Sequence, residues 1–408
     1  MNAAQKIMER INALAKITDE PGRTTRTFAS PAMRGVNELV GFWMREAGMT
    51  VRVDAIGNLI GHYDGEQPAA KILLLGSHLD TVRNAGQFDG PLGVILAIAC
   101  VEELQKKGIR LPFAIEVIGF SDEEGVRYQT AYLGSKVLAG SFDEKDLERE
   151  DAAGISLRDA ILNFGGDPEK LKTARLNPKQ LLGYLEAHIE QGPVLEAKDH
   201  AVGIVTAIAG QSRCKITFTG RAAHAGTTPM NLRQDALCAA AGFILAAESL
   251  ARKTPGLVAT VGQIKADPGA SNVIPEDVDL TLDVRHQDNS ARRKAVAALQ
   301  KIGRKISAAR KNRFVWHFVQ QTDSIQCSPR LSRLLTVAAK KHQRHIITLP
   351  SGAGHDAAVM AQITPTAMLF IRCKQGISHH PEESAKVGDV RTALAVMSDF
   401  IRQLAQTS

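Results

Sequence analysis

The sequence predicts an α/β protein with a mixed, mainly parallel sheet that has helices on both faces, and with a small α+β domain inserted into it. Short apolar runs such as Lys71–Leu75 and Ala367–Ile371 are typical of buried parallel strands, and segments of helical length alternate with them. From about Ala209 the strands instead alternate apolar and polar residues, as half-exposed antiparallel strands do. This change of pattern predicts the inserted domain.

The first half of the chain alternates helices and strands. Apolar periodicity predicts helices, and Ile56-Gly57 predicts a hairpin turn. The expected elements are helices over residues 6–17 and 37–47, strands 51–54 and 58–62, strand 71–75, helix 93–104, strand 113–120, helix 131–138, a polar surface excursion with short helices over 141–180, and strand 182–188. In such an open α/β sheet, ligands bind at the carboxyl ends of the strands.

The second half predicts the inserted domain and the return to the first. Strands at 213–219, 257–261, 278–284 and 314–318, with helices at 235–250 and 291–310, give the order β-α-β-β-α-β of a split-βαβ domain. A helix over 331–341, a strand over 367–371 and a helix over 389–404 complete the larger domain. We therefore expect a catalytic domain from 1–209 and 327–408, and a dimerisation or lid domain from 210–326.

The composition is that of a soluble globular protein. The chain has 408 residues, enough for two domains, with 44% hydrophobic and 23% charged residues. Its five cysteines are scattered and form no CxxC pair, which favours reduced thiols in a cytoplasmic protein. The N-terminus has no apolar core of the kind a signal peptide needs, and no apolar run approaches the ~20 residues of a membrane helix.

The formal net charge of +7 invites comparison with nucleic-acid-binding proteins. Much of the excess lies in the helix expected over 291–310, whose apolar stripe is Val296, Leu299, Ile302 and Ile306. No aromatic interleaving and no nucleic-acid module accompany it. A solvated basic face is therefore the favoured explanation, and the charge fits an anionic small substrate equally well.

Histidines and carboxylates gather at predicted strand ends and in the adjacent glycine-containing loops. Metal-dependent hydrolysis needs deprotonated ligands on rigid elements and one unligated base. A lone histidine in such a place is more often structural, but seven suitable residues at successive positions favour a metal site. They are His78, Asp80, Asp89, Glu123, Glu124, His188 and His379. The adjacent Glu123 and Glu124 point differently, so one can bind a metal while the other faces the substrate.

Nine motifs, spread in order over nearly the whole chain, carry a family resemblance. They are Gly76-Ser77-His78-Leu79-Asp80-Thr81, Phe88-Asp89-Gly90, Asp122-Glu123-Glu124-Gly125, Glu186-Ala187-His188-Ile189-Glu190-Gln191-Gly192, His224-Ala225-Gly226-Thr227-Thr228-Pro229-Met230, Ser271-Asn272-Val273-Ile274-Pro275, Asp283-Val284-Arg285-His286, Ser351-Gly352-Ala353-Gly354-His355-Asp356-Ala357 and Gly376-Ile377-Ser378-His379-His380-Pro381. On these motifs the sequence resembles the metal-dependent amidases that include allantoate amidohydrolase, N-carbamoyl-L-amino acid hydrolase and β-ureidopropionase. These enzymes are relatives of the dinuclear zinc aminoacylases and carboxypeptidases.

The resemblance implies two divalent metal ions that share one carboxylate. One ion would be held by His78, Asp89 and His188, and the other by Asp89, Glu124 and His379. Asp89 would thus bridge the two ions. Histidine and carboxylate ligands suit zinc or manganese first, and cobalt or nickel as further options.

The resemblance also implies roles for three residues around the metals. Asp80 would orient His78 through the other ring nitrogen, and Glu123 would be the general base. His224 would stabilise the oxyanion from across the interface of a homodimer made by the small domains.

A further group of residues is expected to bind the substrate. Arg285, at the end of an alternating strand, is suited to bidentate binding of a carboxylate, with the amides of Asn272 and Gln211 nearby. The glycine loop that contains Gly354 allows close approach of the backbone to a ligand. For His355-Asp356, an active-site role and a structural role stay equally open.

The resemblance implies hydrolysis of the carbamoyl or ureido C–N bond of a small carboxylate. The segment Gln211-Ser212-Arg213 resembles the allantoate-type enzymes, so allantoate or a similar ureido acid is the first candidate substrate. N-carbamoyl-L-amino acids, or the substrate of β-ureidopropionase, are the alternative. An inactive binding relative would be expected to lack a ligand or the base, and neither is missing here.

Overall fold

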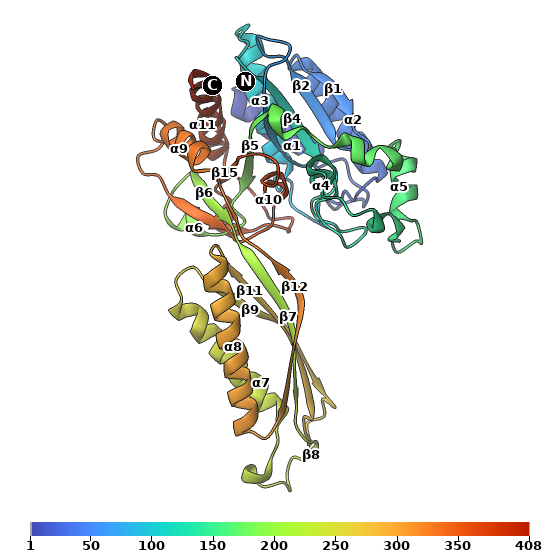
Figure 1. The fold of residues 1–408 in the computed structure, drawn as a ribbon, viewed down its shortest axis with the longest axis vertical. Helices are drawn as coiled ribbons and strands as arrows, with labels where there is room; N and C mark the ends of the chain where they lie inside the picture. The colour runs from blue at the N-terminus through green and yellow to red at the C-terminus, as the bar shows by residue number, and fades with distance from the viewer. Residues whose placement is uncertain (1, 408) are drawn as a thin grey trace. The chain divides into compact units, whose positions relative to one another are not determined.

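The computed structural model describes residues 2–407, which divide into two compact units (Figure 1). The larger unit runs up to Thr206 and resumes at Cys327–Leu349 and from Ala353 onward. The smaller unit comprises Ala207–Gln326 together with Pro350–Gly352. The predicted domain limits at 209/210 and 326/327 lie close to the edges of the smaller unit. No helix within residues 2–407 is long and apolar enough to cross a membrane.

The larger unit is built on a mixed sheet, so the predicted fold class is confirmed. Its strands follow the order β1-β2-β4-β3-β5-β15-β6. The central strands β4, β3, β5 and β15 run parallel, and β1, β2 and β6 join them in antiparallel pairs. The bounds are β1 Thr50–Val53, β2 Leu59–Tyr63, β3 Ile72–His78, β4 Ala114–Phe120, β5 Leu181–Ile189, β6 Val202–Ile208, β14 Thr348–Ser351 and β15 Thr366–Ile371.

The helices of the larger unit are α1 Ala3–Leu14, α2 Pro31–Glu46, α3 Pro91–Lys106, α4 Leu133–Ala139, α5 Leu157–Phe164, α6 Val194–Ala197, α9 Pro329–Ala339, α10 Asp356–Met360 and α11 Val387–Gln406. The predicted starts of the first two helices, at 6 and 37, were wrong. Asn2 forms a capping box with Gln5 at the start of α1, and Ser30 caps α2 just before a proline. Capping therefore sets these starts several residues before the apolar stripe becomes evident.

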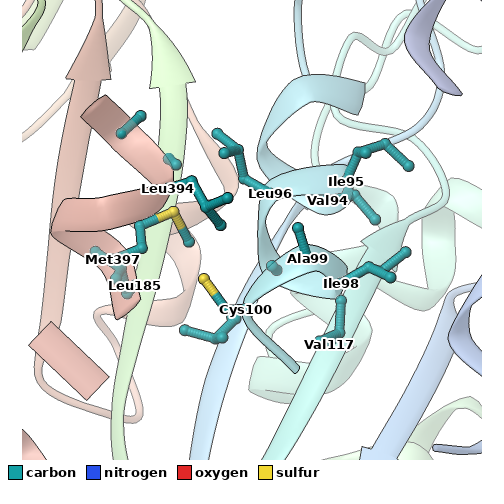
Figure 2. Close-up of a cluster of buried hydrophobic side chains, with 14 of the residues drawn as sticks. Val94, Ile95, Leu96, Ile98, Ala99, Cys100, Val117, Leu185, Leu394 and Met397 are labelled. Atoms are coloured by element: carbon teal, nitrogen blue, oxygen red, sulfur yellow. The ribbon is translucent and has the colours of Figure 1, made fainter. Parts of the chain in front are cut away.

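Helix α3 is buried on all sides, which is why its sequence is apolar all round. Its Leu96 and Cys100 face Leu394 and Met397 of α11, and its Ile98 lies toward β4 (Figure 2). The contacts of α3 with β3, β5 and β4, and with α1 and α11, place it between the sheet and the outer helices. The first turn of this helix follows Asp89 directly, so the packing of α3 fixes where Asp89 is presented.

Leu96→Ala is expected to destabilise the protein by about 2–5 kcal/mol, because Leu96 is fully buried and its truncation removes apolar contacts and leaves a cavity. Urea unfolding followed by circular dichroism measures the change. Leu162→Ala is the matched control, because Leu162 is 53% exposed on α5. A loss at Leu96 no larger than that at Leu162 would show that α3 is not the packed centre of the unit.

Alternation along the parallel strands divides their side chains between two faces. In β5, Leu185 and Ile189 join the main core beside α3. Glu186 and His188, at the intervening even positions, point to the opposite face of the sheet. Both are buried there. The pattern of β5 thus places a polar pair on one face without disturbing the core on the other.

The smaller unit has the predicted order β-α-β-β-α-β. Its strands are β7 Gly210–Thr219, β9 Val258–Asp267, β11 Asp277–His286 and β12 Arg313–Thr322, and its helices are α7 Ala236–Lys253 and α8 Asn289–Ala309. The strands form an antiparallel sheet in the order β12-β7-β11-β9, and both helices pack on one face of it (Figure 1). Two short strands, β8 Ala223–His224 and β10 Val273–Ile274, pair with each other, and β13 Ile325–Gln326 pairs with the end of β6.

The polar excursion predicted over 141–180 contains α5 and three short 3-10 turns, Glu144–Glu148, Pro168–Ala174 and Pro178–Gln180. It is more than a surface loop. Leu157 and Ile161 of α5 pack with Leu133 and Val137 of α4 in a separate buried cluster. This cluster supports the segment that leads from β4 into α4, and that segment carries Glu123 and Glu124.

Candidate metal centre

The carboxyl ends of four neighbouring strands bring the candidate ligands together. Strands β4, β3, β5 and β15 are adjacent in the sheet and parallel. In open α/β sheets this edge is where ligands bind. The side chains that reach it are His78 at the end of β3, Glu123 and Glu124 after β4, His188 in β5 and His379 after β15. Asp89 joins them from the loop that precedes α3.

Asp89 directs each of its carboxylate oxygens to a different group of side chains. Its Oδ1 lies 3.0 Å from Nε2 of His188 and 3.7 Å from Nε2 of His78. Its Oδ2 lies 3.1 Å from Nε2 of His379, and that nitrogen lies 3.3 Å from Oε1 of Glu124. Ligand atoms of His78, Asp89 and His188 all lie within 4.8 Å of one another, as do those of Asp89, Glu124 and His379.

The orientation of the two buried histidines suits metal coordination. Nδ1 of His78 lies 3.0 Å from the carbonyl oxygen of Asp80, and Nδ1 of His188 lies 2.9 Å from that of Ile189. A carbonyl partner places a proton on Nδ1 and leaves Nε2 as the atom facing Asp89. Oδ1 of Asp89 is itself buried without a hydrogen bond from residues 2–407. The side chains present therefore fit divalent cations.

Asp80 connects two of the loops that form the site. Its Oδ1 and Oδ2 accept hydrogen bonds from the backbone N–H groups of Glu123 and Glu124, at 3.0 and 3.1 Å. Its carboxylate lies 3.5 Å from Nδ1 of His78, farther than its own carbonyl oxygen. The nearest partners of the Asp80 carboxylate are therefore the two backbone amides of the turn that carries both glutamates.

Gly90 allows the backbone to approach His78. Its φ of 83° lies in the left-handed region that favours glycine, and a Cβ there would lie 2.5 Å from the ring of His78. Pro91 follows as the first residue of α3. In three consecutive residues, Asp89 thus supplies the carboxylate, Gly90 lets the backbone approach the ring of His78, and Pro91 begins α3.

Charges at the site are strongly coupled through Asp89. Burial alone would raise the pKa of Asp89, but the neighbouring histidines hold it well below its usual range. Hydrogen bonds with Asp89 and Glu124 raise the pKa of His379 to about 10. Burial also raises the pKa of Glu123 well above that of a free glutamate, although the charge of His78 opposes the shift. In the metal-free protein, protons on the histidines neutralise the carboxylates that a bound cation would otherwise neutralise.

Metal binding is expected to release at least about one proton per chain near pH 8, because a histidine must lose its proton to act as a ligand. The pKa of His379 rises from 6.5 to about 10 in the folded protein. Its protonation therefore stabilises the metal-free fold below pH 6.5, and this contribution is lost as the pH rises through about 10. Titration calorimetry in two buffers of different ionisation enthalpy counts the protons. Equal heats in both buffers would contradict this prediction.

His355 lies beside the centre. Its ring centroid is 4.5 Å from that of His188 in an edge-to-face contact. Two further compact groups of ligand atoms are those of Glu186, His188 and His355 and those of His78, Glu123 and Glu124. Burial and the charge of His188 hold the pKa of His355 well below its usual value, so the ring is neutral. Asp356 begins α10 and accepts a hydrogen bond from Oγ of Ser135 at 2.5 Å.

Gly354 approaches a tyrosine closely. A Cβ on this glycine would lie 1.8 Å from the hydroxyl oxygen of Tyr132, so no larger residue fits without movement of the tyrosine. The backbone N–H of Tyr132 donates to the carbonyl oxygen of Glu123 at 3.2 Å. The glycine loop and the turn of the two glutamates therefore share Tyr132 as a neighbour.

Three residues at the centre were not predicted from the sequence. Gln191 and Ser378 donate hydrogen bonds to Oδ2 of Asp89, and Glu383 accepts a hydrogen bond from the backbone N–H of Asp89. Gln191 and Ser378 lie inside two of the family motifs and Glu383 follows one of them. This proximity to proposed ligands was the only available signal for them.

The expected substrate residues of the smaller unit form two separate groups. Gln211 of β7 pairs with Arg285 of β11. At the other end of β11, His224 pairs with Val273, and the carbonyl oxygen of Asn272 accepts a hydrogen bond from Ala225. The eight residue-to-residue steps from Asp277 to Arg285 span about 27 Å of strand. Within one chain, Asn272 therefore lies beside His224, at the other end of β11 from Arg285.

Arg285 is held by an acidic neighbour. Its Nε and one terminal nitrogen bind the two carboxylate oxygens of Asp283 at 3.0 and 2.9 Å, and its other terminal nitrogen donates to the carbonyl oxygen of Gly352 at 2.6 Å. The guanidinium edge that was expected to bind a substrate carboxylate is bound to Asp283 in this structure. Arg285 is thus a fixed, oriented cation.

Comparison with known proteins identifies the family. The profile of Peptidase family M20/M25/M40 matches residues 74–403. The chain is 40% identical to an N-carbamoyl-L-amino acid amidohydrolase of Geobacillus stearothermophilus over all of both chains. It is 39% identical to allantoate deiminase 1 of Glycine max, over 97% of this chain and 88% of that protein.

A solved structure gives the same result. The hydantoinase/carbamoylase family amidase of Burkholderia multivorans superposes with a TM-score of 0.93 at 32% identity, over 98% of each chain. The likeness thus extends over both units and includes every element that contributes to the candidate centre. The chain is a hydrolase of the M20/M25/M40 peptidase family, in the branch of that family that holds the N-carbamoyl-L-amino acid amidohydrolases and the allantoate deiminases.

Proposed function

We propose that this chain is a cytoplasmic, dinuclear metal-dependent amidohydrolase that cleaves the ureido C–N bond of allantoate or a similar ureido acid. The observation that carries the proposal is the division of the Asp89 carboxylate. One oxygen faces His78 and His188, and the other faces Glu124 and His379. The names of the relatives support the type of bond, because those proteins are named as acting on carbamoyl amino acids or on allantoate.

Two divalent ions, zinc or manganese, would be held by these two groups, with Asp89 common to both. Bound there, they would supply Lewis-acid polarisation of the ureido carbonyl and would lower the pKa of a water molecule. The donor set of imidazole nitrogens and carboxylate oxygens suits both metals. Oδ1 of Asp89 is buried and makes no hydrogen bond with residues 2–407, and Nε2 of His78 and Nε2 of His188 face it, which supports a cation at the first group.

Glu123 is assigned the proton transfers. It accepts a proton from the attacking water and then delivers it to the leaving nitrogen as this C–N bond breaks. The carbamic acid that remains loses carbon dioxide and so breaks the second C–N bond, and the products are ammonia, carbon dioxide and an amine. Its side chain is buried, and its backbone N–H is bound to Asp80, so the carboxylate is presented from a fixed turn. Burial raises its pKa and so makes it a better base than an exposed glutamate.

The substrate carboxylate is assigned to Arg285 and Gln211. Gly354 is assigned the role of letting the backbone of its loop approach the substrate closely. His224 is exposed and has Asn272 as its neighbour, which supports a joint role for the two across the interface of a homodimer. In this proposal His224 of the partner subunit stabilises the oxyanion, and Asn272 of the partner subunit supplies an amide to the substrate. Closure of the smaller unit would exclude water during turnover.

N-carbamoyl-L-amino acids are the second candidate substrates. The observation in their favour is the match of 40% identity that covers the whole of this chain and of the Geobacillus stearothermophilus amidohydrolase. Allantoate deiminases match at nearly the same identity, so overall similarity does not separate the two substrates. The Gln211-Ser212-Arg213 segment places allantoate first.

An ammonia-release assay separates the two candidates. Metal-loaded protein is incubated with allantoate and, in parallel, with several N-carbamoyl-L-amino acids, and chelated protein serves as the blank. The proposal predicts a kcat/KM for allantoate at least about tenfold above that for any carbamoyl amino acid, equivalent to about 1.4 kcal/mol of transition-state discrimination. The reverse ratio would favour the second candidate, and hydrolysis of neither class would refute both.

A further inference from the structure

Glu383 connects two segments that carry candidate ligands. Glu383 is 2% exposed. Its hydrogen-bond partners, Phe88 and Asp89, lie 295 and 294 positions earlier in the sequence. One of its carboxylate oxygens accepts hydrogen bonds from the backbone N–H groups of these two residues, at 2.7 and 3.0 Å. Since Glu383 lies four positions after His379, it ties the segment of one candidate ligand to the loop of another.

Ser378 and Gln191 complete the contact with Asp89. Oγ of Ser378 donates to Oδ2 of Asp89 at 2.6 Å, and Nε2 of Gln191 donates to the same oxygen at 2.9 Å. Oγ of Ser378 also lies 3.2 Å from the second carboxylate oxygen of Glu383. The carboxylate of Asp89 is therefore held at Oδ2 by two side chains, and its backbone is held by Glu383.

The fold leaves space for Glu383 at Gly86. A Cβ on Gly86 would lie 2.3 Å from the Cβ of Glu383 and 2.5 Å from its carboxylate. This approach is closer than any residue with a Cβ allows, so Gly86 provides the room in which Glu383 reaches the Asp89 loop. Gly86 thus offers a second way to displace Glu383 without changing its chemistry.

The two candidate ligand groups differ in how firmly the fold holds them. His78 and His188 lie in strands, with side chains 3% and 1% exposed. His379 is 48% exposed, lies outside any strand and has a left-handed φ of 58°. A non-glycine residue in that conformation needs neighbouring contacts to hold it there. The second group therefore depends on the segment from Ser378 to Glu383.

We propose that Glu383 is a positioning residue that, through its hydrogen bond with the backbone of Asp89 and its contact with Ser378, holds Asp89 and His379 in place for the second metal ion. The inference rests on the dinuclear centre of the proposed function and adds to it that the two ions differ in their dependence on Glu383. Loss of the Glu383 side chain weakens the group of Asp89, Glu124 and His379. The group of His78, Asp89 and His188 keeps its affinity, because strands β3 and β5 hold its two histidines, and Ser378 and Gln191 bind Oδ2 of Asp89 and not the Oδ1 that faces this group.

Competition between the metal-free protein and a chromophoric zinc chelator tests the proposal. Wild type is expected to bind two zinc ions. Glu383→Ala is expected to bind one ion within about threefold of the wild-type affinity and the other about 10–100-fold more weakly, the usual effect of removing a residue that supports a metal ligand. Glu382→Ala is the matched control, because Glu382 is exposed next to Glu383, and both affinities should stay at the wild-type values.

Three further variants, one of them a rescue, keep the test independent of the folding of Glu383→Ala. Gly86→Ala displaces Glu383 without altering it, and Ser378→Ala removes one hydrogen bond to Oδ2 of Asp89. Both are expected to weaken the second ion selectively, and Ser378→Thr, which keeps the hydroxyl, should restore it. Two unchanged affinities in these variants, or an equal fall in both, would overturn the inference. A wild type that binds only one zinc ion would instead refute the dinuclear centre itself, before any variant is compared.

Discussion

Glu123→Gln is expected to lower kcat by about 10³-fold while both metal ions stay bound, because general acid–base catalysis by a positioned side chain contributes about 10²–10⁴-fold. Glutamine has nearly the same shape but cannot accept the proton of the attacking water. The backbone contact of residue 123 with Asp80 does not involve the side chain, so the turn should persist in the variant. The loss should therefore appear in kcat and leave KM nearly unchanged.

The neighbouring glutamate supplies the contrast. Glu124 belongs to the group with Asp89 and His379, so Glu124→Gln should lose one metal ion as well as activity. Metal analysis and steady-state kinetics on both variants separate the two roles. Turnover of Glu123→Gln within about tenfold of wild type, with metals bound, would exceed what loss of the general base allows and would show that another group is the base.

Asp89→Ala is expected to have the largest effect on metal content, since it removes one carboxylate oxygen from the group with His78 and His188 and the other from the group with Glu124 and His379. The buried His78 and His188 and the exposed His379 would then lack their common anion, and Gln191 and Ser378 would lose their acceptor. Loss of the ions removes several kcal/mol of transition-state stabilisation, so activity should fall by more than about 10³-fold. The variant should bind less than one ion per chain.

His380→Ala is the control for this variant. His380 is exposed and lies next to His379 in the sequence, but it belongs to none of the compact groups of candidate ligands among residues 2–407. Its variant should keep two ions and nearly full activity. If Asp89→Ala bound two ions as tightly as wild type, Asp89 would not be the bridge, and the division of its two oxygens would have no role in metal binding.

The parallel strands explain why so much of the centre was predictable. A buried strand reads as an apolar run, and the residues that follow it are brought to one edge by the parallel topology. His78, at the end of β3, and Glu123 and Glu124, after β4, were found in this way. The arrangement of the candidate ligands around Asp89 was not evident from spacing, and it came from the resemblance to a family.

The contacts of Glu383 were not predicted because they join distant segments. The hydrogen bonds from Phe88 and Asp89 to Glu383 join residues almost 300 positions apart. No local sequence pattern predicts a contact between such distant residues. The separation of Asn272 from Arg285 follows from strand β11, whose full length was longer than the predicted run of 278–284. Asp283 could likewise not be assigned to Arg285, because residues two apart on a strand share a face without having to bind each other.

The most direct test of a dinuclear amidohydrolase is a titration of the metal-free protein with manganese or zinc, in which ammonia release from allantoate is measured at each addition. The account predicts no turnover without metal and a rise that ends at two ions per chain, with allantoate hydrolysed in preference to N-carbamoyl-L-amino acids. Turnover by the metal-free protein, or full activity reached with one ion per chain, would contradict it.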